Sequence, residues 1–247
     1  MDVEKSPKIT HFLISLCIGI FLLEYYYEFS YGAVVLQQIF YDFGFSLKNL
    51  LENKFWVFLT SMFLHGSPEH LVLNMIALFF FGRAVEMKLG KKKFLLAFFI
   101  SAFLGDLAII FANLIGLLPP DVPTIGISAA VFGLMGTAML IKPFEFIMFP
   151  YLIPIPLVLV ALLYTLYNIA AFLLIFTAKL SSNVSYISHI GGLAGGMLFG
   201  FKQEGSKKGF IVIILLLTLL VVTPIIWVIF EYLEVFNYAT LITKVMK

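Results

Sequence analysis

The sequence predicts an all-α protein, specifically a polytopic membrane helical bundle, from three observations. Of its 247 residues, 62% are hydrophobic and only 12% are charged, and the mean hydropathy is +1.05. Charged residues make up about 25% of an ordinary soluble domain. The chain also contains seven apolar stretches near the ~20 residues that cross a bilayer as a helix. These stretches are 9–28, 68–87, 94–117, 126–148, 152–177, 184–201 and 209–236.

The distribution of Lys and Arg predicts how the bundle is oriented. If all seven stretches span the membrane, 11 of the 16 basic residues lie on the same side as the N-terminus. Because basic residues concentrate in cytoplasmic loops, we expect a cytoplasmic N-terminus in a multi-pass protein of the cell membrane. Residues 29–66 are too apolar for a solvated loop, and we expect short helices in the outer interface there.

The same pattern divides the chain into two parts and excludes some functions. Residues 1–203 form the expected six-helix core, and residues 204–247 form a linker and one additional transmembrane helix. Cys17 is the only cysteine, so an intramolecular disulfide is impossible. Outside the membrane flanks there is no basic cluster and the net charge is +2, so we expect the lipid bilayer, and no nucleic acid, among its partners.

Polar residues gather at one depth of the expected bundle. The second, fourth and sixth stretches run in the same direction, from the outer to the inner face, and each carries polar side chains near its start. These residues are His65, His70, Asn74, Ser128 and His189. Because polar groups are costly in lipid unless they meet a partner or a cavity, we expect these side chains to converge on a site that opens to the outer face.

Ser128 and His189 are the expected nucleophile and base. The prolines before Gly126 resist helix, so Ser128 falls in a first helical turn, where backbone N–H groups lack intrahelical partners and the helix dipole is positive. Such N–H groups can stabilise an oxyanion beside the hydroxyl. The alternatives are that Ser128 is a helix cap and that His189 is a buried histidine bonded to backbone.

Small residues at intervals of four predict that the helices carrying these two side chains pack closely. They are Ser188, Gly192, Gly196 and Gly200 in the sixth stretch, and Ala129, Gly133 and Thr137 in the fourth. Small residues let helix backbones approach in lipid, which would bring the hydroxyl and the imidazole within the ~2.6–3.2 Å needed for proton transfer. Ordinary helix packing explains the glycines equally well.

The segment from His65 to Asn74 supplies further donors. His70 and Asn74 are four residues apart and share a helix face, and such side chains can donate to a developing oxyanion. A zinc site is the alternative. His65 and His70 do not have the spacing of a His-Glu-x-x-His motif, and a third ligand would have to come from elsewhere, so we expect no metal and no cofactor.

Together these motifs resemble those of the rhomboid intramembrane serine proteases. The resemblance runs from about residue 55 to residue 200 and rests on the order and spacing of five motifs. They are Trp56 with Thr60; His65-x4-His70-x3-Asn74; Gly82-Arg83-Ala84-Val85-Glu86-x2-Leu89-Gly90; Gly126-x-Ser128 with Gly133; and His189-x2-Gly192-x3-Gly196. It implies a six-helix core followed by a seventh helix.

The resemblance also implies a role for each matching residue. Ser128 is the nucleophile and His189 the base of a dyad, and transmembrane segments of membrane proteins are the substrates. The side chains of His65 and Asn74, with the Ser128 backbone N–H, form the oxyanion hole. The implied supporting residues are His70, Phe132, Gly126 and Gly192, with Phe132 packing against the histidine. Glu86 is structural, and the fifth stretch and the cap before the sixth stretch form the gate for lateral entry of substrates.

Three residues depart from the family pattern. Ala129 stands where glycine is usual, and its methyl group could crowd the oxyanion site. Val57 stands where arginine is common. Asp106 in the third stretch matches no family role, and it is either a hydrogen-bonded structural aspartate or a functional group. Two rival functions remain open: a non-catalytic rhomboid-like protein that binds transmembrane clients, and a channel or transporter, which would need a polar path through both membrane halves.

Overall fold

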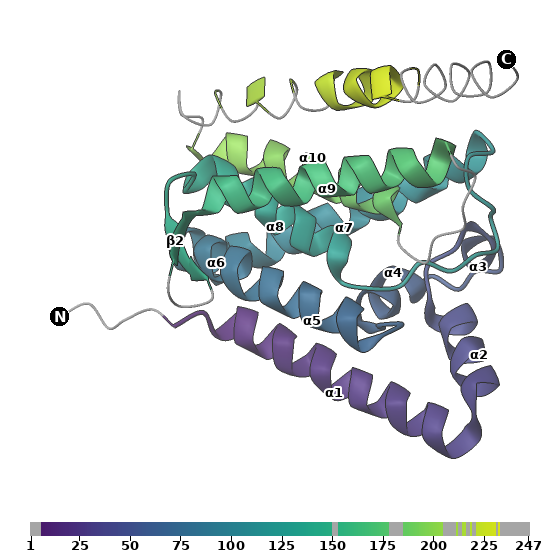
Figure 1. Ribbon diagram of the computed structural model, residues 1–247. Coiled ribbons are helices and arrows are strands. Elements are labelled where there is room, and N and C mark those ends of the chain that lie inside the picture. The colour runs from purple at the N-terminus through teal and green to yellow at the C-terminus, as the bar shows by residue number, and fades with distance from the viewer. Residues whose placement is uncertain are drawn as a thin grey trace, which may run out of the picture.

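The computed structural model describes residues 6–149, 153–177 and 185–204, together with residues 211, 214–215, 218, 221–230 and 232. It is a bundle of helices that pack side by side (Figure 1). The helices of the bundle are α1 (Lys8–Tyr31), α5 (Pro68–Ala77), the π-helical η2 (Leu78–Gly82), α6 (Arg83–Leu89), α7 (Lys91–Leu114), α8 (Ser128–Ile141), α9 (Leu157–Thr177) and α10 (Tyr186–Glu204). The fold confirms the predicted helical membrane bundle.

Not every expected span has the length that we predicted. By length and composition, four described helices can cross a membrane, namely Lys8–Tyr31, Pro68–Leu89, Lys91–Leu114 and Leu157–Leu174. The stretch 126–148 was wrong at its end: α8 has 14 residues and stops at Ile141, before Pro143. The chain there forms β1 (Phe146–Phe149), which pairs antiparallel with β2 (Ile153–Pro156). Thirteen of the 28 residues of the seventh stretch lie outside the described residues, and the described part includes a helix at Val221–Phe230.

Helix α8 lies at the centre of the bundle. All of its residues except Ala129 are buried, and α7 and α10 pack against it. A Cβ atom at Gly192 or Gly196 of α10 would overlap the backbone of α8, and Thr137 Oγ1 donates to the Gly196 carbonyl at 2.9 Å. The expected close packing of these two helices is therefore confirmed, and it depends on glycine at the points of contact.

Buried carboxylates attach α1 to this core at both ends. Glu86 on α6 accepts hydrogen bonds from the backbone N–H groups of Ile9 and Thr10 and from the Thr10 hydroxyl, at 2.8–3.0 Å. It thus satisfies free N–H groups at the helix N-terminus, where negative charge is favourable. Near the other end of α1, Glu24 accepts from the His65 backbone N–H at 3.1 Å.

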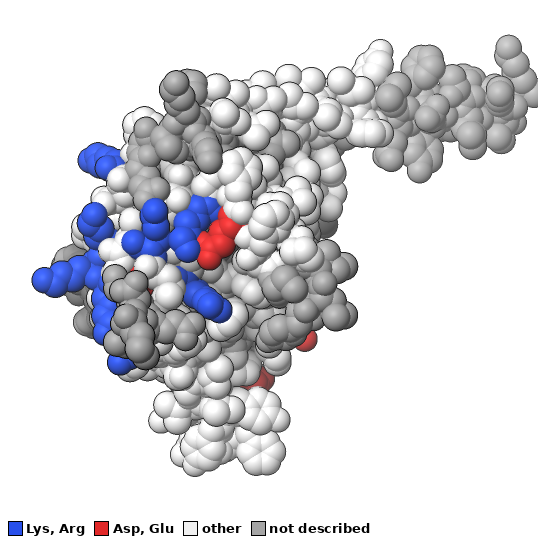
Figure 2. All heavy atoms as spheres, turned by 90° about the vertical axis from the view of Figure 1, so that its left-hand side faces the viewer, with Lys and Arg blue, Asp and Glu red and all other residues white. Residues whose placement is uncertain are grey.

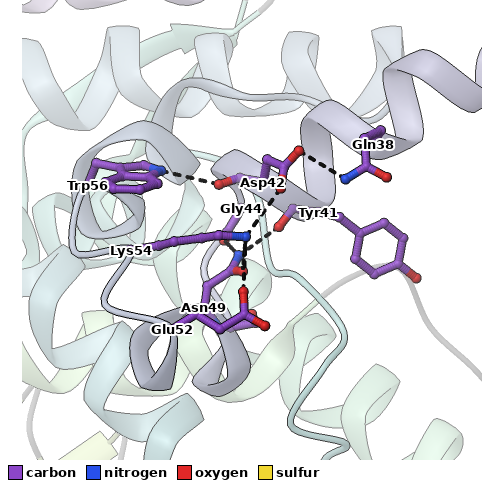
Figure 3. Close-up of polar contacts among 9 residues, drawn as sticks. Gln38, Tyr41, Asp42, Gly44, Asn49, Glu52, Lys54 and Trp56 are labelled. Atoms are coloured by element: carbon purple, nitrogen blue, oxygen red, sulfur yellow. Dashed lines mark hydrogen bonds and ion pairs between the residues drawn. The ribbon is translucent and has the colours of Figure 1, made fainter.

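The segment between α1 and α5 contains the expected short helices. They are α2 (Ala33–Phe43), α3 (Leu47–Leu51), α4 (Val57–Thr60) and the 3-10 turn η1 (Ser61–Phe63). Lys54 connects them, because its ammonium lies 3.2 Å from Asp42 and 3.1 Å from Glu52, while the Trp56 indole N–H donates to the Asp42 carbonyl (Figure 3). Phe45 and Thr124 exchange two backbone hydrogen bonds, which attach this segment to the chain that leads into α8.

Charge is unevenly distributed on the bundle. Lys and Arg side chains gather on the end of the molecule at which α1 begins (Figure 2). The helices α5, α8 and α10 start at the opposite end (Figure 1). The polar residues at the starts of these three helices therefore lie away from the basic end.

Candidate active site

Ser128 and His189 are in direct contact. Ser128 is the first residue of α8, and His189 is in the first turn of α10. The Ser128 Oγ lies 2.7 Å from His189 Nε2, and the two residues are only 8% and 6% exposed. This distance is within the range for proton transfer, and the two side chains belong to helices whose starts are separated by 58 residues of sequence.

Gly126 shapes the turn that places Ser128. Its φ of +115° is unfavourable for residues with a side chain, and its N–H donates to the Ser61 carbonyl at 2.8 Å. A Cβ atom at this position would lie 2.7 Å from His70 Cε1 and 2.8 Å from His70 Nε2. Glycine is therefore needed here for its backbone conformation and for the space that the imidazole of His70 occupies.

The two histidines of the second helical stretch have different surroundings. The His70 ring lies against Gly126, and the same Cβ position is 3.8 Å from Ser128 Oγ, so the ring and the hydroxyl both adjoin this glycine. The His65 ring is 5.2 Å from the His70 ring, and its Nδ1 lies 3.2 Å from the Phe63 carbonyl. The resemblance implied that His65 belongs to the oxyanion hole and that His70 supports the site, and these roles stay predictions; of the two rings, that of His70 lies against Gly126.

Burial keeps His65 neutral. Its ring is almost completely enclosed, and its Nε2 has no hydrogen-bond partner among the described residues. Burial, with a smaller contribution from the charge of His70, lowers the pKa of His65 to about 4.

Asn74 is also buried, one turn after His70, and its amide donates to the His70 carbonyl at 2.9 Å.

Aromatic rings hold the imidazole of His189. Phe132 on α8 stacks on it with ring centroids 4.3 Å apart and an interplanar angle of 11°, as the family resemblance implied. Tyr164 on α9 also stacks on Phe132, with ring centroids 4.9 Å apart. These two stacking contacts join the three rings in what is called here the ring column, which restricts rotation of the histidine.

One polar contact of His189 escaped the sequence analysis. Asn168 on α9 is 3% exposed, and its Oδ1 lies 2.6 Å from His189 Nδ1. Its Nδ2 donates to the Tyr186 carbonyl at 3.4 Å. The available signal was an amide side chain in the middle of an apolar stretch, where a polar residue usually has a specific partner.

The three departures from the family pattern fit the structure. A Cβ atom at Gly105 of α7 would lie 2.6 Å from the Ala129 Cβ, so the methyl group of Ala129 is accommodated because α7 has a glycine there. Val57 is fully buried in a small apolar cluster. Asp106 is buried and lines a cavity of about 10 Å³ with Gly126 and Ser188, close to the minimum volume for one water molecule.

The fold and this site define an integral membrane protein with a Ser–His pair enclosed among its helices. The family model of the rhomboid domain matches residues 52–206. Since this match covers more than half of the chain, the protein belongs to the rhomboid family. In the part of the chain that the structure describes, no group of three or more His, Cys, Asp or Glu side chains could hold a metal ion.

Individual relatives share the same region. The chain is 28% identical to YdcA of Bacillus subtilis over 167 residues, which are 67% of this chain and 75% of YdcA. It is 27% identical to rhomboid protease GluP of the same organism over 205 residues, 83% of this chain but 36% of GluP. It is 35% identical to inactive RHOMBOID-like protein 8 of Arabidopsis thaliana over 98 residues, 39% of this chain and 26% of that protein. Similarity to the family thus extends to proteins named as proteases and to one named inactive.

Proposed function

We propose that the protein is an intramembrane serine endopeptidase that cleaves transmembrane segments of membrane proteins with Ser128 and His189. The observation that carries the proposal is the 2.7 Å contact between Ser128 Oγ and His189 Nε2 at the N-terminus of α8. A serine hydroxyl and an imidazole can both be neutral, which suits a site inside a bilayer. A helix cap or a structural histidine would not require the hydroxyl and the imidazole to meet.

The reaction follows from the positions of these groups. His189 Nε2 takes the hydroxyl proton as Ser128 Oγ attacks the peptide carbonyl, and the resulting imidazolium gives that proton to the leaving amine as the C–N bond breaks. Water, deprotonated by His189, then attacks the acyl-enzyme and releases the carboxylic acid and the serine.

Three groups stabilise the oxyanion in this proposal. They are the free N–H groups in the first turn of α8, the His70 ring and the Asn74 amide. The contact of the His70 ring with Gly126, two residues before Ser128, favours His70 over His65 as the histidine donor.

The proposal includes an orientation in the cell membrane. The basic end of the bundle faces the cytoplasm, so the site at the opposite end opens to the outer face (Figure 2). An intact substrate helix hides its carbonyls in hydrogen bonds. Substrates therefore have transmembrane segments that unwind easily, and they enter laterally beside α9.

The test is cleavage of a model transmembrane substrate by the purified protein in liposomes, combined with labelling by a fluorophosphonate probe. Ser128→Ala abolishes both signals, a loss of at least about 10³-fold, because the nucleophile is removed. The matched control is Ser15→Ala, an exposed serine of α1, which leaves both signals unchanged.

Other results would overturn the proposal. Cleavage that persists in Ser128→Ala excludes this nucleophile. A folded parent protein that neither cleaves nor reacts with the probe indicates a non-catalytic member that binds transmembrane clients. Solute flux through the liposomes that does not depend on Ser128 indicates a channel or transporter.

A further inference from the structure

Helix α9 contributes a third side chain to the Ser128–His189 pair. Asn168 comes from the middle of α9, and its Oδ1 lies 2.6 Å from His189 Nδ1, on the opposite side of the ring from Ser128. We propose that Asn168 is a positioning residue that fixes the tautomer and the orientation of His189. The inference rests on the proposed function of the pair, but it also concerns a property of His189 that can be measured without catalysis.

The hydrogen bonds of Asn168 select one tautomer of the imidazole. To accept the proton of Ser128, Nε2 needs a free lone pair, so the ring proton must be on Nδ1. The amide oxygen of Asn168 can only accept a hydrogen bond, so it pairs with Nδ1–H and excludes the other tautomer. The amide is itself oriented, because its Nδ2 donates to the Tyr186 carbonyl. Asn168 thus keeps His189 in the form that acts as a base.

An amide suits this position better than a carboxylate. Asn168 is 3% exposed and lies in a helix of high apolar content, where a permanent charge would be costly. The amide oxygen still carries a partial negative charge, which stabilises the imidazolium that forms during the reaction. A neutral triad of Ser128, His189 and Asn168 is therefore compatible with an apolar environment.

The same helix holds the ring in a second way. Tyr164 is one turn before Asn168 on the same face of α9, and it stacks on Phe132, which stacks on His189. The imidazole is thus oriented by a hydrogen bond and by a ring column that both involve α9. Consequently, the base is fully oriented only while α9 is packed against α8 and α10.

The test compares three variants of α9 in the full chain. Asn168→Leu has a similar size but cannot accept a hydrogen bond, and Asn168→Asp keeps an acceptor. Thr165→Val is the matched control, because Thr165 is buried on the same helix and its hydroxyl has no partner among the described residues. Each variant is assayed for kcat and KM, for the rate of fluorophosphonate labelling, and by ¹⁵N NMR of the histidine rings in micelles.

Asn168→Leu lowers kcat and the rate of fluorophosphonate labelling by about 10- to 100-fold and changes KM less than about twofold. This is the effect expected when a hydrogen bond to a group that becomes charged is lost. Thr165→Val matches the parent. In Asn168→Asp, activity is retained and the acid side of its pH–rate profile moves to higher pH. The parent shows His189 with its proton on Nδ1, and Asn168→Leu loses this signature.

The outcomes separate this inference from the proposed function. If the parent cleaves through Ser128 but Asn168→Leu has the kcat and NMR spectrum of Thr165→Val, only the role of Asn168 is overturned. If the parent does not cleave but Asn168→Leu changes the tautomer of His189, the proposed function fails and the positioning role stands. If Asn168→Leu does not fold, an unchanged pH profile in Asn168→Asp overturns the inference.

Discussion

Replacing Gly126 by alanine tests whether His70 and the α8 turn act together. The φ of +115° at Gly126 costs an alanine about 1–2 kcal/mol. The new methyl group would also lie 2.7 Å from His70 Cε1. To restore an ordinary contact of 3.4 Å, the ring must move by about 0.7 Å, the difference between these two distances.

A displacement of this size should reduce the rate strongly. A misplacement of about 1 Å near a reacting centre can lower turnover by about 10²-fold, and loss of one oxyanion donor costs a similar factor. We therefore expect Gly126→Ala to lower kcat for the transmembrane substrate about 10²-fold. Its free energy of unfolding in detergent should fall by about 1–3 kcal/mol, which combines the backbone strain with the displaced ring.

The matched control is Gly116→Ala, just after α7. Gly116 also has a positive φ, +72°, but an added Cβ atom would meet nothing within 4 Å. This variant should lose about 1 kcal/mol of stability through backbone strain and keep the kcat of the parent. Equal kcat values for Gly126→Ala and Gly116→Ala would refute the view that His70, held against Gly126, contributes to turnover.

Glu86→Gln should lower the free energy of unfolding by about 2–3 kcal/mol, because it weakens three hydrogen bonds to the start of α1. Glu28→Gln, on the exposed surface of α1, is the control and should have little effect. Equal unfolding midpoints for the two variants would contradict this prediction. The pKa of His65 is about 4 in the folded protein, below the unfolded value of 6.5. The free energy of unfolding should therefore be highest above pH 6.5 and should fall by up to about 3 kcal/mol as the pH falls toward 4. A pH–stability curve that is no flatter in His65→Asn than in the parent would argue against this prediction. His70→Ala should lower kcat about 10²-fold or more, whereas His65→Ala should mainly lower the free energy of unfolding. If His65→Ala lowers kcat more than His70→Ala in the cleavage assay, His65 is the histidine that stabilises the oxyanion.

The sequence by itself determined the class of the protein and indicated which two residues, Ser128 and His189, form the pair. Long apolar stretches with few charges can only be satisfied as helices in lipid, so the bundle followed from composition and length. Ser128 and His189 were identifiable because glycines and prolines mark the local turns and because small residues at intervals of four predict close helix packing. These are short-range patterns, and the geometry of α8 and α10 agrees with them.

Other features were decided by contacts between segments distant in the sequence. Which of the two histidines lies against Gly126 depends on how that turn packs against α5, and a spacing of five residues does not contain that information. Asn168 meets His189 only because α9 packs beside α10, and the Ala129 methyl group fits only because α7 has Gly105 opposite it. Periodicity specifies the face of a helix on which a residue lies, whereas the partner on that face is set by the packing of whole helices, and so only the tertiary structure decided these contacts.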